Sequence, residues 1–297
     1  MFNYITFFAF SKSDSIGYSQ AVGTTERNLG YDMDMYQLNQ IPSKAQIQKY
    51  LRKIVFGKNL FCPVCRSRKI VKYEERYRCK KCRLKFSLLS HTWLSDMKLP
   101  LQQFWLLLWC WTTQIPVRQA ISLSKCSDNT IMHWYDRFRE YLPYEQDILE
   151  HFVQLDEAYF KDRVLVMGKQ KGTRKIAYQM HKGNSVDRGK ALRFLYESVK
   201  PTSSLWTDGA SIYKNIDQWW PVIHTRDIHS KFEFSHTSEI EGMFGLLRTF
   251  IRRMYHHVTP EKLELYVREF CFRFSSPELF ENPQYYLEKT LTLVPTD

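Results

Sequence analysis

Residues 153–160 of the chain, Val-Gln-Leu-Asp-Glu-Ala-Tyr-Phe, have the apolar and aromatic composition of a β-strand but carry two adjacent carboxylates. Because side chains alternate along a strand, Asp156 lies on the same face as Gln154. Glu157 lies on the opposite face with Leu155, so at most one acid can face a given site. Removing water from a carboxylate costs on the order of several kcal/mol unless a cation replaces it. Asp156 is therefore a metal ligand, a member of an ion pair, or an acid at the solvated end of the strand.

The segments that follow predict a mixed sheet flanked by helices. We expect strands at 153–160, 163–167, 175–180, 204–209 and 222–225, and helices at 189–199, 238–253 and 260–274. A hairpin turn over 168–172 is expected to join the second and third strands, because glycine stands at both ends of it. Three consecutive strands, a helix, a strand and then further helices are the order of the ribonuclease H fold, which belongs to the α/β class.

Two further acids occupy informative places in this order. Asp208 ends the fourth strand, and Glu241 lies early in the helix that follows the fifth. If the first and fourth strands are neighbours, Asp156 and Asp208 lie side by side, and the helix brings a glutamate towards them. Converging carboxylates suit Mg²⁺ or Mn²⁺, and two such ions about 4 Å apart catalyse phosphodiester displacement. Glu239 is a rival for the third position, but it points away from Glu241 on a helix; either acid can instead simply favour the helix dipole.

Four of the seven cysteines form two close pairs, Cys62-Pro-Val-Cys65 and Cys79-Lys-Lys-Cys82. Each pair places two thiolates on one tight turn, and two such turns supply the four soft ligands that structural Zn²⁺ prefers. The alternating residues between the pairs predict two short strands and hence a zinc ribbon. A redox role for the pairs lacks a thioredoxin-like context. The odd number of cysteines also argues against a disulfide framework.

The basic charge of the chain is concentrated around these cysteines. The formal net charge is +12, and the segment from Lys49 to Lys85 contains 14 Lys or Arg residues with only two acids, Glu74 and Glu75. A local excess of this kind favours binding to a polyanion, most commonly nucleic acid, although a solvated basic face gives the same pattern. The candidate DNA contacts in this segment are Lys69, Lys72, Arg78, Lys80 and Lys81.

Three helices are expected between the zinc ribbon and the sheet. A very apolar helix follows Pro100, a short helix spans 117–123, and Ser127 caps a third helix. Helix, tight turn and helix in this order are typical of a helix-turn-helix, which would read a DNA groove through Asn129, Thr130 or His133. Packing of the three helices without contact to DNA is the alternative.

Several motifs together resemble a known family. They are Leu-Asp-Glu-Ala-Tyr-Phe at 155–160, Trp-Thr-Asp-Gly at 206–209, His-Thr-x-x-Ile-Glu at 236–241 and Tyr-His-His at 255–257. With the zinc ribbon upstream, they resemble the IS1595/ISXO2-like transposases and their eukaryotic Merlin relatives over about residues 45 to 275. The resemblance implies an acidic-triad transposase that binds terminal inverted repeats and joins their 3′ ends to target DNA, with Asp156 and Asp208 as metal-binding aspartates.

The chain departs from that family at two positions. Ser238 stands where relatives often have Asn, and Arg248 where they often have Lys. If that Asn is a ligand in the relatives, Glu241 must supply the third oxygen here. His229 and His236 are candidates for positioning phosphate or supporting the ligands, or else ordinary surface or core residues. Arg248, Arg252 and Arg253 are candidates for clamping DNA phosphates, or else form a solvated helix face.

These patterns divide the chain into five parts. They are an N-terminal extension without an assigned role (1–45), the zinc ribbon (46–90), the helix-turn-helix-like segment (91–148), the ribonuclease H-like catalytic domain (149–275) and a C-terminal tail (276–297). We expect an active transposase that binds double-stranded DNA as a homodimer or higher oligomer. The alternatives are a catalytically inactive DNA-binding derivative and a nuclease without strand transfer.

The location of the protein in the cell is constrained only by what its N-terminus lacks. The apolar run 2–10 is too short to span a membrane and lacks the basic residues of a signal peptide. We therefore expect a protein that is not secreted and has no membrane anchor. Its place is the cytoplasm or nucleoid of a bacterium or the nucleus of a eukaryote.

Overall fold

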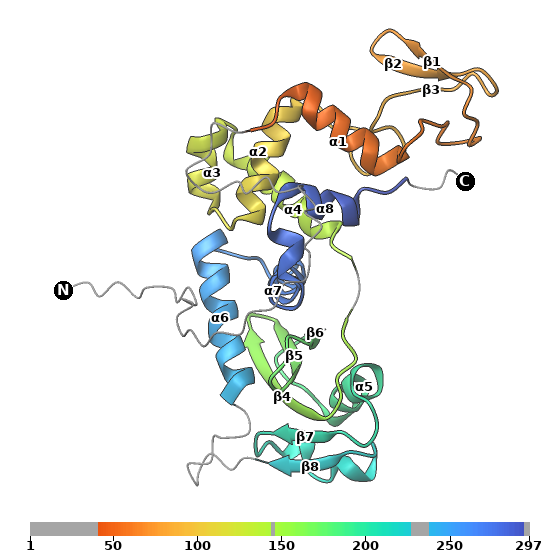
Figure 1. Cartoon of the computed structure of the whole chain (residues 1–297). Helices are drawn as coiled ribbons and strands as arrows, with labels where there is room; N and C mark the ends of the chain where they lie inside the picture. Colours follow the sequence, from red (N-terminus) through yellow and green to blue (C-terminus); the bar gives the residue numbers. More distant parts are fainter. Residues whose placement is uncertain (1–40, 144–145, 227–237, 294–297) are drawn as a thin grey trace, which may run out of the picture. The chain divides into compact units, whose positions relative to one another are not determined.

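The computed structural model describes residues 41–143, 146–226 and 238–293, which all fall within one compact unit spanning Met33–Asp297 (Figure 1). Along this unit, a small ribbon of three short strands is followed by three helices and then by a five-stranded mixed sheet with its own helices. The predicted fold class is therefore confirmed. Within the described ranges, no helix is both long and apolar enough to cross a membrane.

The sheet has the strand order β6-β5-β4-β7-β8. Its strands are β4 (Phe152–Phe160), β5 (Arg163–Gln170), β6 (Ile176–Lys182), β7 (Ser204–Thr207) and β8 (Ile223–Arg226). β5 runs antiparallel to β4 and β6, whereas β7 runs parallel to β4 and β8. Counted along the chain this is the order 3-2-1-4-5, the ribonuclease H-like arrangement that the sequence predicts. The acid-bearing strand β4 is the central one.

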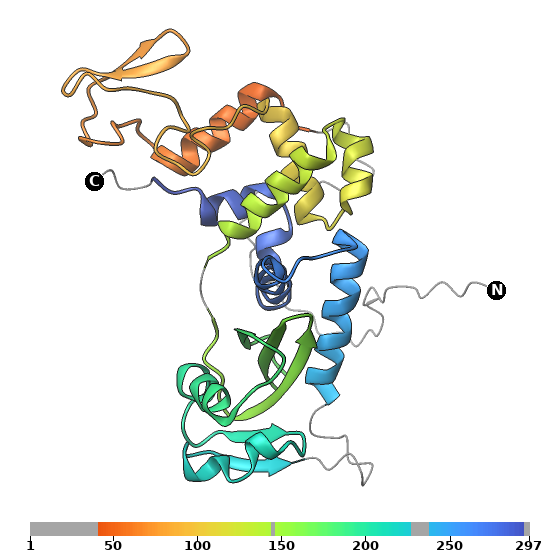
Figure 2. The same ribbon diagram turned by 180° about the vertical axis from the view of Figure 1, so that it is seen from behind.

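Helices cover the two faces of the sheet, and β4 contributes to both cores. Leu155 packs with the buried residues of α5 (Arg188–Ser198). Ala158 belongs to the other core, which contains α6 (Ser238–Tyr255) and α7 (Leu263–Ser275) (Figures 1 and 2). The alternation predicted for residues 153–160 is thus confirmed, because neighbours along β4 enter opposite cores.

The turn between β5 and β6 differs from the prediction. Gly168 does not begin the turn; it lies inside β5, opposite Leu155 of β4. A Cβ atom at this position would lie 2.8 Å from Leu149 Cδ1 and 2.9 Å from Phe194 Cζ, so the glycine allows α5 to approach the sheet closely. Gly172 is the turn residue, with a φ of 69° that a residue with a side chain rarely adopts.

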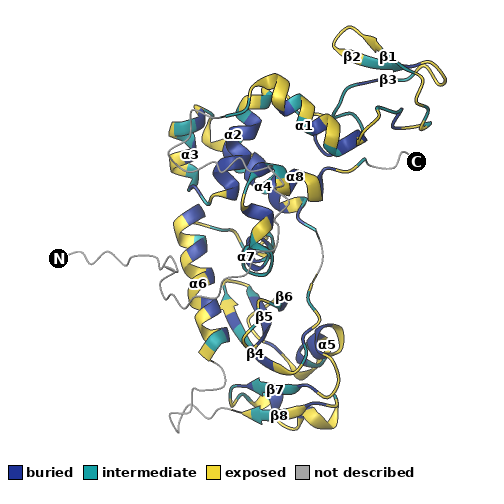
Figure 3. Cartoon of the chain, viewed as in Figure 1, coloured by how far each residue is buried: buried dark blue, intermediate teal, exposed yellow. Residues whose placement is uncertain are grey.

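The three expected helices are found upstream of the sheet as α2 (Leu101–Thr112), α3 (Val117–Ser124) and α4 (Asp128–Glu140), and a further helix, α1 (Lys44–Phe56), precedes the ribbon. All nine residues at positions 104–112 of α2 are buried (Figure 3), as its lack of charge predicts. Between α3 and α4, Lys125 turns the chain with a φ of 54°, and the Ser127 hydroxyl accepts the Thr130 N–H at 3.3 Å. The serine therefore sets the start of α4, as predicted.

Residues 276–293 are not the tail that the sequence analysis assigned. They contain the 3₁₀ helix η5 (Pro277–Phe280) and α8 (Pro283–Thr290). Tyr286 of α8 is fully buried; its ring lies 5.1 Å from that of Trp111, and its hydroxyl donates to the Phe138 carbonyl at 2.9 Å. This segment therefore completes the core formed by α2 and α4.

A buried ion cluster ties α4 to α7. Arg139 of α4 and Glu269 of α7 have no exposed side-chain surface, and Arg139 Nε donates to Glu269 Oε2 at 2.7 Å. The Tyr255 hydroxyl and Arg273 donate to the same carboxylate. The guanidinium of Arg139 also lies 4.0 Å from the ring centre of Tyr266. A buried pair of this kind is very sensitive to the loss of one partner, because the remaining charge has no water to solvate it.

We predict that Glu269→Ala lowers the free energy of unfolding by about 3–5 kcal/mol, because the buried Arg139 loses its buried partner and keeps, among the described residues, only Asp136, at 2.5 Å, as a charged partner. Urea denaturation of the full chain measures the change. Glu264→Ala on the exposed side of the same helix is the control, with an expected change of about 0.5 kcal/mol or less. Equal stability of the two variants would show that the cluster does not join α4 to α7.

Candidate active site and zinc centre

The four cysteines of the ribbon converge as predicted. Their sulfur atoms all lie within 4.8 Å of one another. Cys62 Sγ is 3.5 Å from Cys82 Sγ, and Cys65 Sγ is 3.5 Å from Cys79 Sγ. Tetrahedral zinc with Zn–S bonds of about 2.3 Å requires separations of about 3.8 Å, so the four thiols already have nearly the spacing of a zinc site.

The same backbone turn accompanies each of the two cysteine pairs. One residue after each Cys-x-x-Cys pair, Arg66 and Arg83 adopt φ values of 57° and 62°. Their N–H groups donate to the carbonyls of Cys62 and Cys79, each at 3.0 Å. The strands β1 (Ile70–Tyr73), β2 (Arg76–Cys79) and β3 (Lys85–Phe86) hold the two turns together. The sequence analysis predicted the first two strands and missed the third, which has only two residues.

The electrostatics of the thiols also fit a bound cation. Backbone N–H groups, foremost that of Cys82, lower the pKa of Cys79 to about 6 and so favour its thiolate. Burial raises the pKa of Cys62 to about 12, because its thiolate would lie out of water without a counter-charge. A divalent cation among the four sulfur atoms supplies that counter-charge. The Cys₄ cluster is therefore consistent with structural zinc.

The two aspartates lie side by side on neighbouring parts of the sheet. β4 and β7 are parallel neighbours whose last registered pair is Leu155 with Thr207, so Asp156 and Asp208 follow at the same level of adjacent strands. Asp156 Oδ1 accepts the N–H of Glu157 at 2.8 Å, and Asp208 Oδ1 accepts the N–H of Ala210 at 3.0 Å. Both side chains are half-buried. The expected adjacency of the first and fourth strands is thus found.

Glu157 lies on the other face of β4, where Tyr213 of the 3₁₀ helix η2 (Ser211–Tyr213) donates a hydrogen bond to its carboxylate. Burial raises the pKa of Glu157 to about 7, and repulsion from Asp156 and Asp208 adds to the shift. The Tyr213 contact was not predicted, because the two residues are 56 positions apart and nothing in the sequence pairs them. It fixes the segment that follows Asp208 to the central strand.

Helix α6 presents its two glutamates to opposite sides. Ile240 N–H donates to Gln154 Oε1 at 3.0 Å, which places the start of α6 over β4. Glu239 Oε2 lies 2.5 Å from Lys169 Nζ of β5. Residues two positions apart on a helix point about 200° apart. Since Glu239 faces Lys169 of β5, Glu241 points away from that lysine.

The three acids do not form a closed ligand cluster in the structure. Among the residues described, the four cysteines are the only group of three or more candidate ligands whose atoms converge. Glu241 is exposed, whereas Asp156 and Asp208 are half-buried. Ser238 is the exposed first residue of α6. The predicted supporting residues His229 and His236 lie outside the described residues.

The candidate DNA contacts lie on three surfaces. On the ribbon, Lys69, Lys72, Lys80 and Lys81 are exposed and Arg78 is half-buried; on α4, Asn129 and His133 are exposed; on α6, Arg248, Arg252 and Arg253 are exposed. The Thr130 hydroxyl is 2.9 Å from the hydroxyl of Ser127, so it serves the helix cap. Helical spacing places Arg248 and Arg252 on the edge of α6 that carries Glu241, whereas Arg253 points elsewhere.

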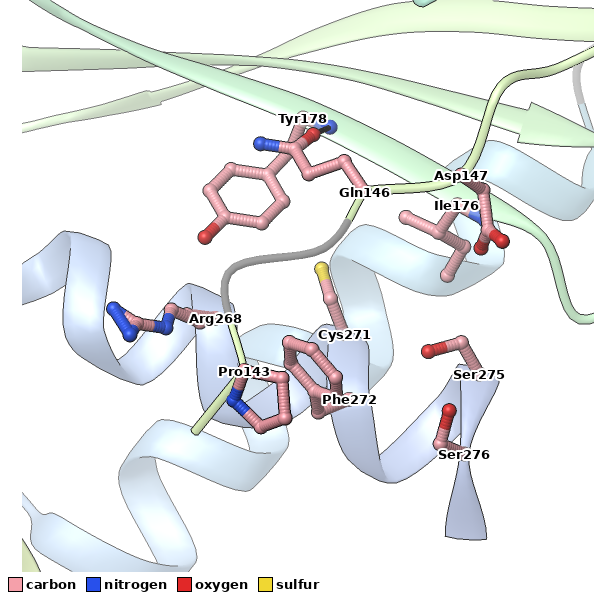
Figure 4. A pocket seen from close by; sticks show the side chains of 10 residues that line it. All are labelled: Pro143, Gln146, Asp147, Ile176, Tyr178, Arg268, Cys271, Phe272, Ser275 and Ser276. Atoms are coloured by element: carbon pink, nitrogen blue, oxygen red, sulfur yellow. Dashed lines mark hydrogen bonds between the residues drawn. The ribbon is translucent and has the colours of Figure 1, made fainter. Parts of the chain in front are cut away.

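A small cavity of about 170 Å³ lies between the start of β6 and α7 (Figure 4). Its lining includes Asp147, Tyr178, Arg268 and Cys271, and none of the three acids. Asp156 and Asp208 instead lie on β4 and just after β7, and Glu241 lies on the exposed side of α6. An open site of this kind suits a large polymer better than a small enclosed substrate.

Fold and site together define a ribonuclease H-like domain preceded by a zinc ribbon. Two family models match the chain: a transposase zinc-ribbon domain over residues 42–85 and an ISXO2-like transposase domain over residues 161–275. The chain therefore contains an ISXO2-like (IS1595) DDE transposase domain and a transposase zinc-ribbon domain. The second match includes Asp208 and Glu241 and begins just after β4, which carries Asp156.

Other comparisons add little to this assignment. Among solved structures, the chain is similar to a chain in the cryo-EM structure of the simian T-cell lymphotropic virus intasome in complex with PP2A regulatory subunit B56 gamma. The identity is 14%, the TM-score is 0.33, and the similarity covers 57% of this chain and 67% of that one. No curated protein matches the chain.

We predict that Cys79→Ser abolishes stoichiometric zinc binding and unfolds the ribbon, because three thiols cannot complete the tetrahedron. Elemental analysis measures the bound zinc, and hydrogen exchange measures protection in β1 to β3. The matched control is Cys126→Ser, which replaces a half-buried thiol outside the cluster and should leave both unchanged. A Cys79→Ser protein with one zinc per chain and a protected ribbon would contradict a Cys₄ site.

Proposed function

We propose that this protein is a DNA transposase that binds the terminal inverted repeats of its element, cleaves them and joins their 3′ ends to target DNA. The observation that carries the proposal is the parallel pairing of β4 with β7, which sets Asp156 beside Asp208 in a chain that contains an ISXO2-like transposase domain. Neighbouring carboxylates on adjacent strands can hold the metal ions that phosphodiester chemistry of this kind requires.

In this proposal Asp156 and Asp208 hold Mg²⁺ or Mn²⁺, and Glu241 supplies the third carboxylate. Carboxylate oxygens suit these hard cations. Burial is the main cause of the raised pKa of Glu157, and the negative charge of Asp156 and Asp208, which a cation would offset, adds to it. When bound, the metal activates a water or a 3′-hydroxyl and stabilises the leaving oxygen. The chain's own part is to present Asp156 and Asp208 on adjacent strands and Glu241 on α6, with Tyr213 fixing the segment after Asp208.

Glu239 is a poor candidate for the third ligand because it already has a partner. Its carboxylate pairs with Lys169 and accepts the Gly172 N–H at 3.3 Å, and these contacts lower its pKa. Both partners belong to β5 and the turn after it, on the side away from β7. A ligand role would require Glu239 to leave Lys169, whose side chain is almost fully buried.

The remaining parts of the chain serve DNA in this proposal. The ribbon and the α2–α4 segment bind the element's ends, and the domain at 149–275 carries out the chemistry. Joining two ends to one target requires that they be held together, so we expect a homodimer or higher oligomer on DNA. A catalytically inactive DNA-binding protein is the second candidate, favoured by Ser238 at a position where relatives often carry Asn.

We predict that Asp156→Asn and Asp208→Asn each lower Mg²⁺-dependent cleavage of an end-containing duplex by at least about 10²-fold, because each loses a charge that holds the metal. Glu241→Gln should have an effect of the same size. Gel assays with the purified full chain measure cleavage and joining, and fluorescence anisotropy checks that DNA binding remains.

Glu239→Gln is the matched control, since it makes the same chemical change two residues away. It breaks the ion pair with Lys169, so it should lower stability but keep cleavage within about tenfold of the original rate. Full activity in Asp156→Asn or Asp208→Asn would overturn the catalytic assignment. Loss of activity in Glu239→Gln alone, with Glu241→Gln active, would move the third ligand to Glu239. A wild-type chain that binds ends but never cleaves them would establish the second candidate.

A further inference from the structure

A groove of about 560 Å³ lies between α1, the β1–β2 hairpin of the ribbon and the segment that leads into α2. Its basic lining residues are Lys44, Lys49, Arg52, Lys72 and Arg76, against a single acid, Glu75. Three of these cations come from α1 and two from the hairpin, so the groove has positive charge on both walls. Part of the basic charge that is concentrated in this segment of the sequence therefore lies on one concave surface.

The charges of the groove have no ion-pair partners among the described residues. In the part of the chain that the structure describes, none of the five cations takes part in an ion pair. All five are exposed. By contrast, basic residues of the sheet domain such as Lys169, Lys175 and Lys200 each pair with a glutamate. Repulsion among unpaired cations is unfavourable, and a polyanion that enters the groove relieves it.

Both walls of the groove are held in place by the core. Ile47 and Leu51 of α1 are buried, and Tyr50 stacks on Trp105 of α2 with 5.9 Å between ring centres. The ring centre of Phe56, at the end of α1, lies 5.3 Å from that of Phe61 of the ribbon and 6.1 Å from that of Phe86. The two sets of cations are therefore joined through one aromatic cluster. A preformed surface loses little entropy when it binds.

The spacing of the cations suits a nucleic-acid backbone. Lys44 and Arg52 are eight residues apart on one side of α1, which corresponds to about 12 Å along the helix axis. Successive phosphates of one B-DNA strand advance by about 3.4 Å along the duplex axis, so this distance spans roughly three to four phosphates. The lining offers charged ends of long side chains and few rigid hydrogen-bonding groups, which favours phosphate over base edges.

We propose that this groove binds the phosphate backbone of duplex DNA and that α1 is thus part of the DNA-binding surface together with the ribbon. The groove supplies affinity without sequence preference, so base readout belongs to other elements. The inference rests on the DNA-binding part of the proposed function and is independent of the catalytic acids. It also assigns a role to residues Lys44, Lys49, Arg52 and Arg76, which the sequence alone did not single out.

The test compares two double variants that remove equal charge. Lys44→Ala/Lys72→Ala removes one lysine from each wall of the groove. Lys53→Ala/Lys58→Ala removes two exposed lysines from α1 and the turn after it that do not line the groove. Affinity of the zinc-loaded full chain for a random-sequence duplex is measured by fluorescence anisotropy over a series of salt concentrations. The slope of log K against log[salt] counts the phosphates neutralised.

Each lost phosphate contact lowers the magnitude of this slope by about 0.9, so Lys44→Ala/Lys72→Ala should lower it by about 2. Lys53→Ala/Lys58→Ala should leave the slope unchanged. The Lys44→Arg/Lys72→Arg protein keeps both charges and should restore the slope, which separates charge loss from misfolding. The ratio of affinities for two different duplex sequences should stay within about twofold.

Three results would overturn the proposal: an unchanged slope in the groove variant, an equal decrease in the control, or a tenfold change in the sequence ratio, which would mean base contacts. Cleavage is not read in this assay. A chain that shows the predicted slopes but never cleaves DNA loses the transposase proposal and keeps the groove.

Discussion

The parallel pairing of β4 with β7 is the constraint on which the rest of the molecule depends. A parallel pair cannot be joined by a tight turn, because the chain must return from the end of the first strand to the level at which that strand began before the second strand can start. Here β5, β6 and α5 fill that interval. The register of β4 with β7 places Asp156 level with Asp208, which is why they lie together although 51 residues separate them.

Most of the fold follows from patterns that act over short distances. Apolar and aromatic composition assigned residues 153–160 to a strand with its two acids on opposite faces, and the two cysteine pairs located the ribbon. Ser127 placed the start of α4. The errors arose where a residue's role depends on a distant partner: Gly168 reads as a turn residue until Phe194 of α5 is placed against it. The eight residues of α8 carry too few apolar positions to reveal that Tyr286 fills the core of another segment.

The candidate site shows the same division. Its candidate acids were chosen from the sequence, because carboxylates within or just after predicted strands are conspicuous. The sequence also favoured Glu241 over Glu239, but it could not reveal the pairing of Glu239 with Lys169 across 70 residues. The contact of Tyr213 with Glu157 was equally hidden. A metal site also draws on charge balance, and the partners that set this balance are brought together only by the folded sheet.

Tyr286 has a consequence for incomplete copies of the gene. Its side chain lies between Trp111 and Phe138, so α8 from the end of the chain supports helices encoded in its first half. A product that stops after α7 keeps every residue of α2, α3 and α4 but leaves a void among them, and voids of this size in a core are strongly destabilising. Any DNA binding by those helices therefore depends on synthesis reaching α8.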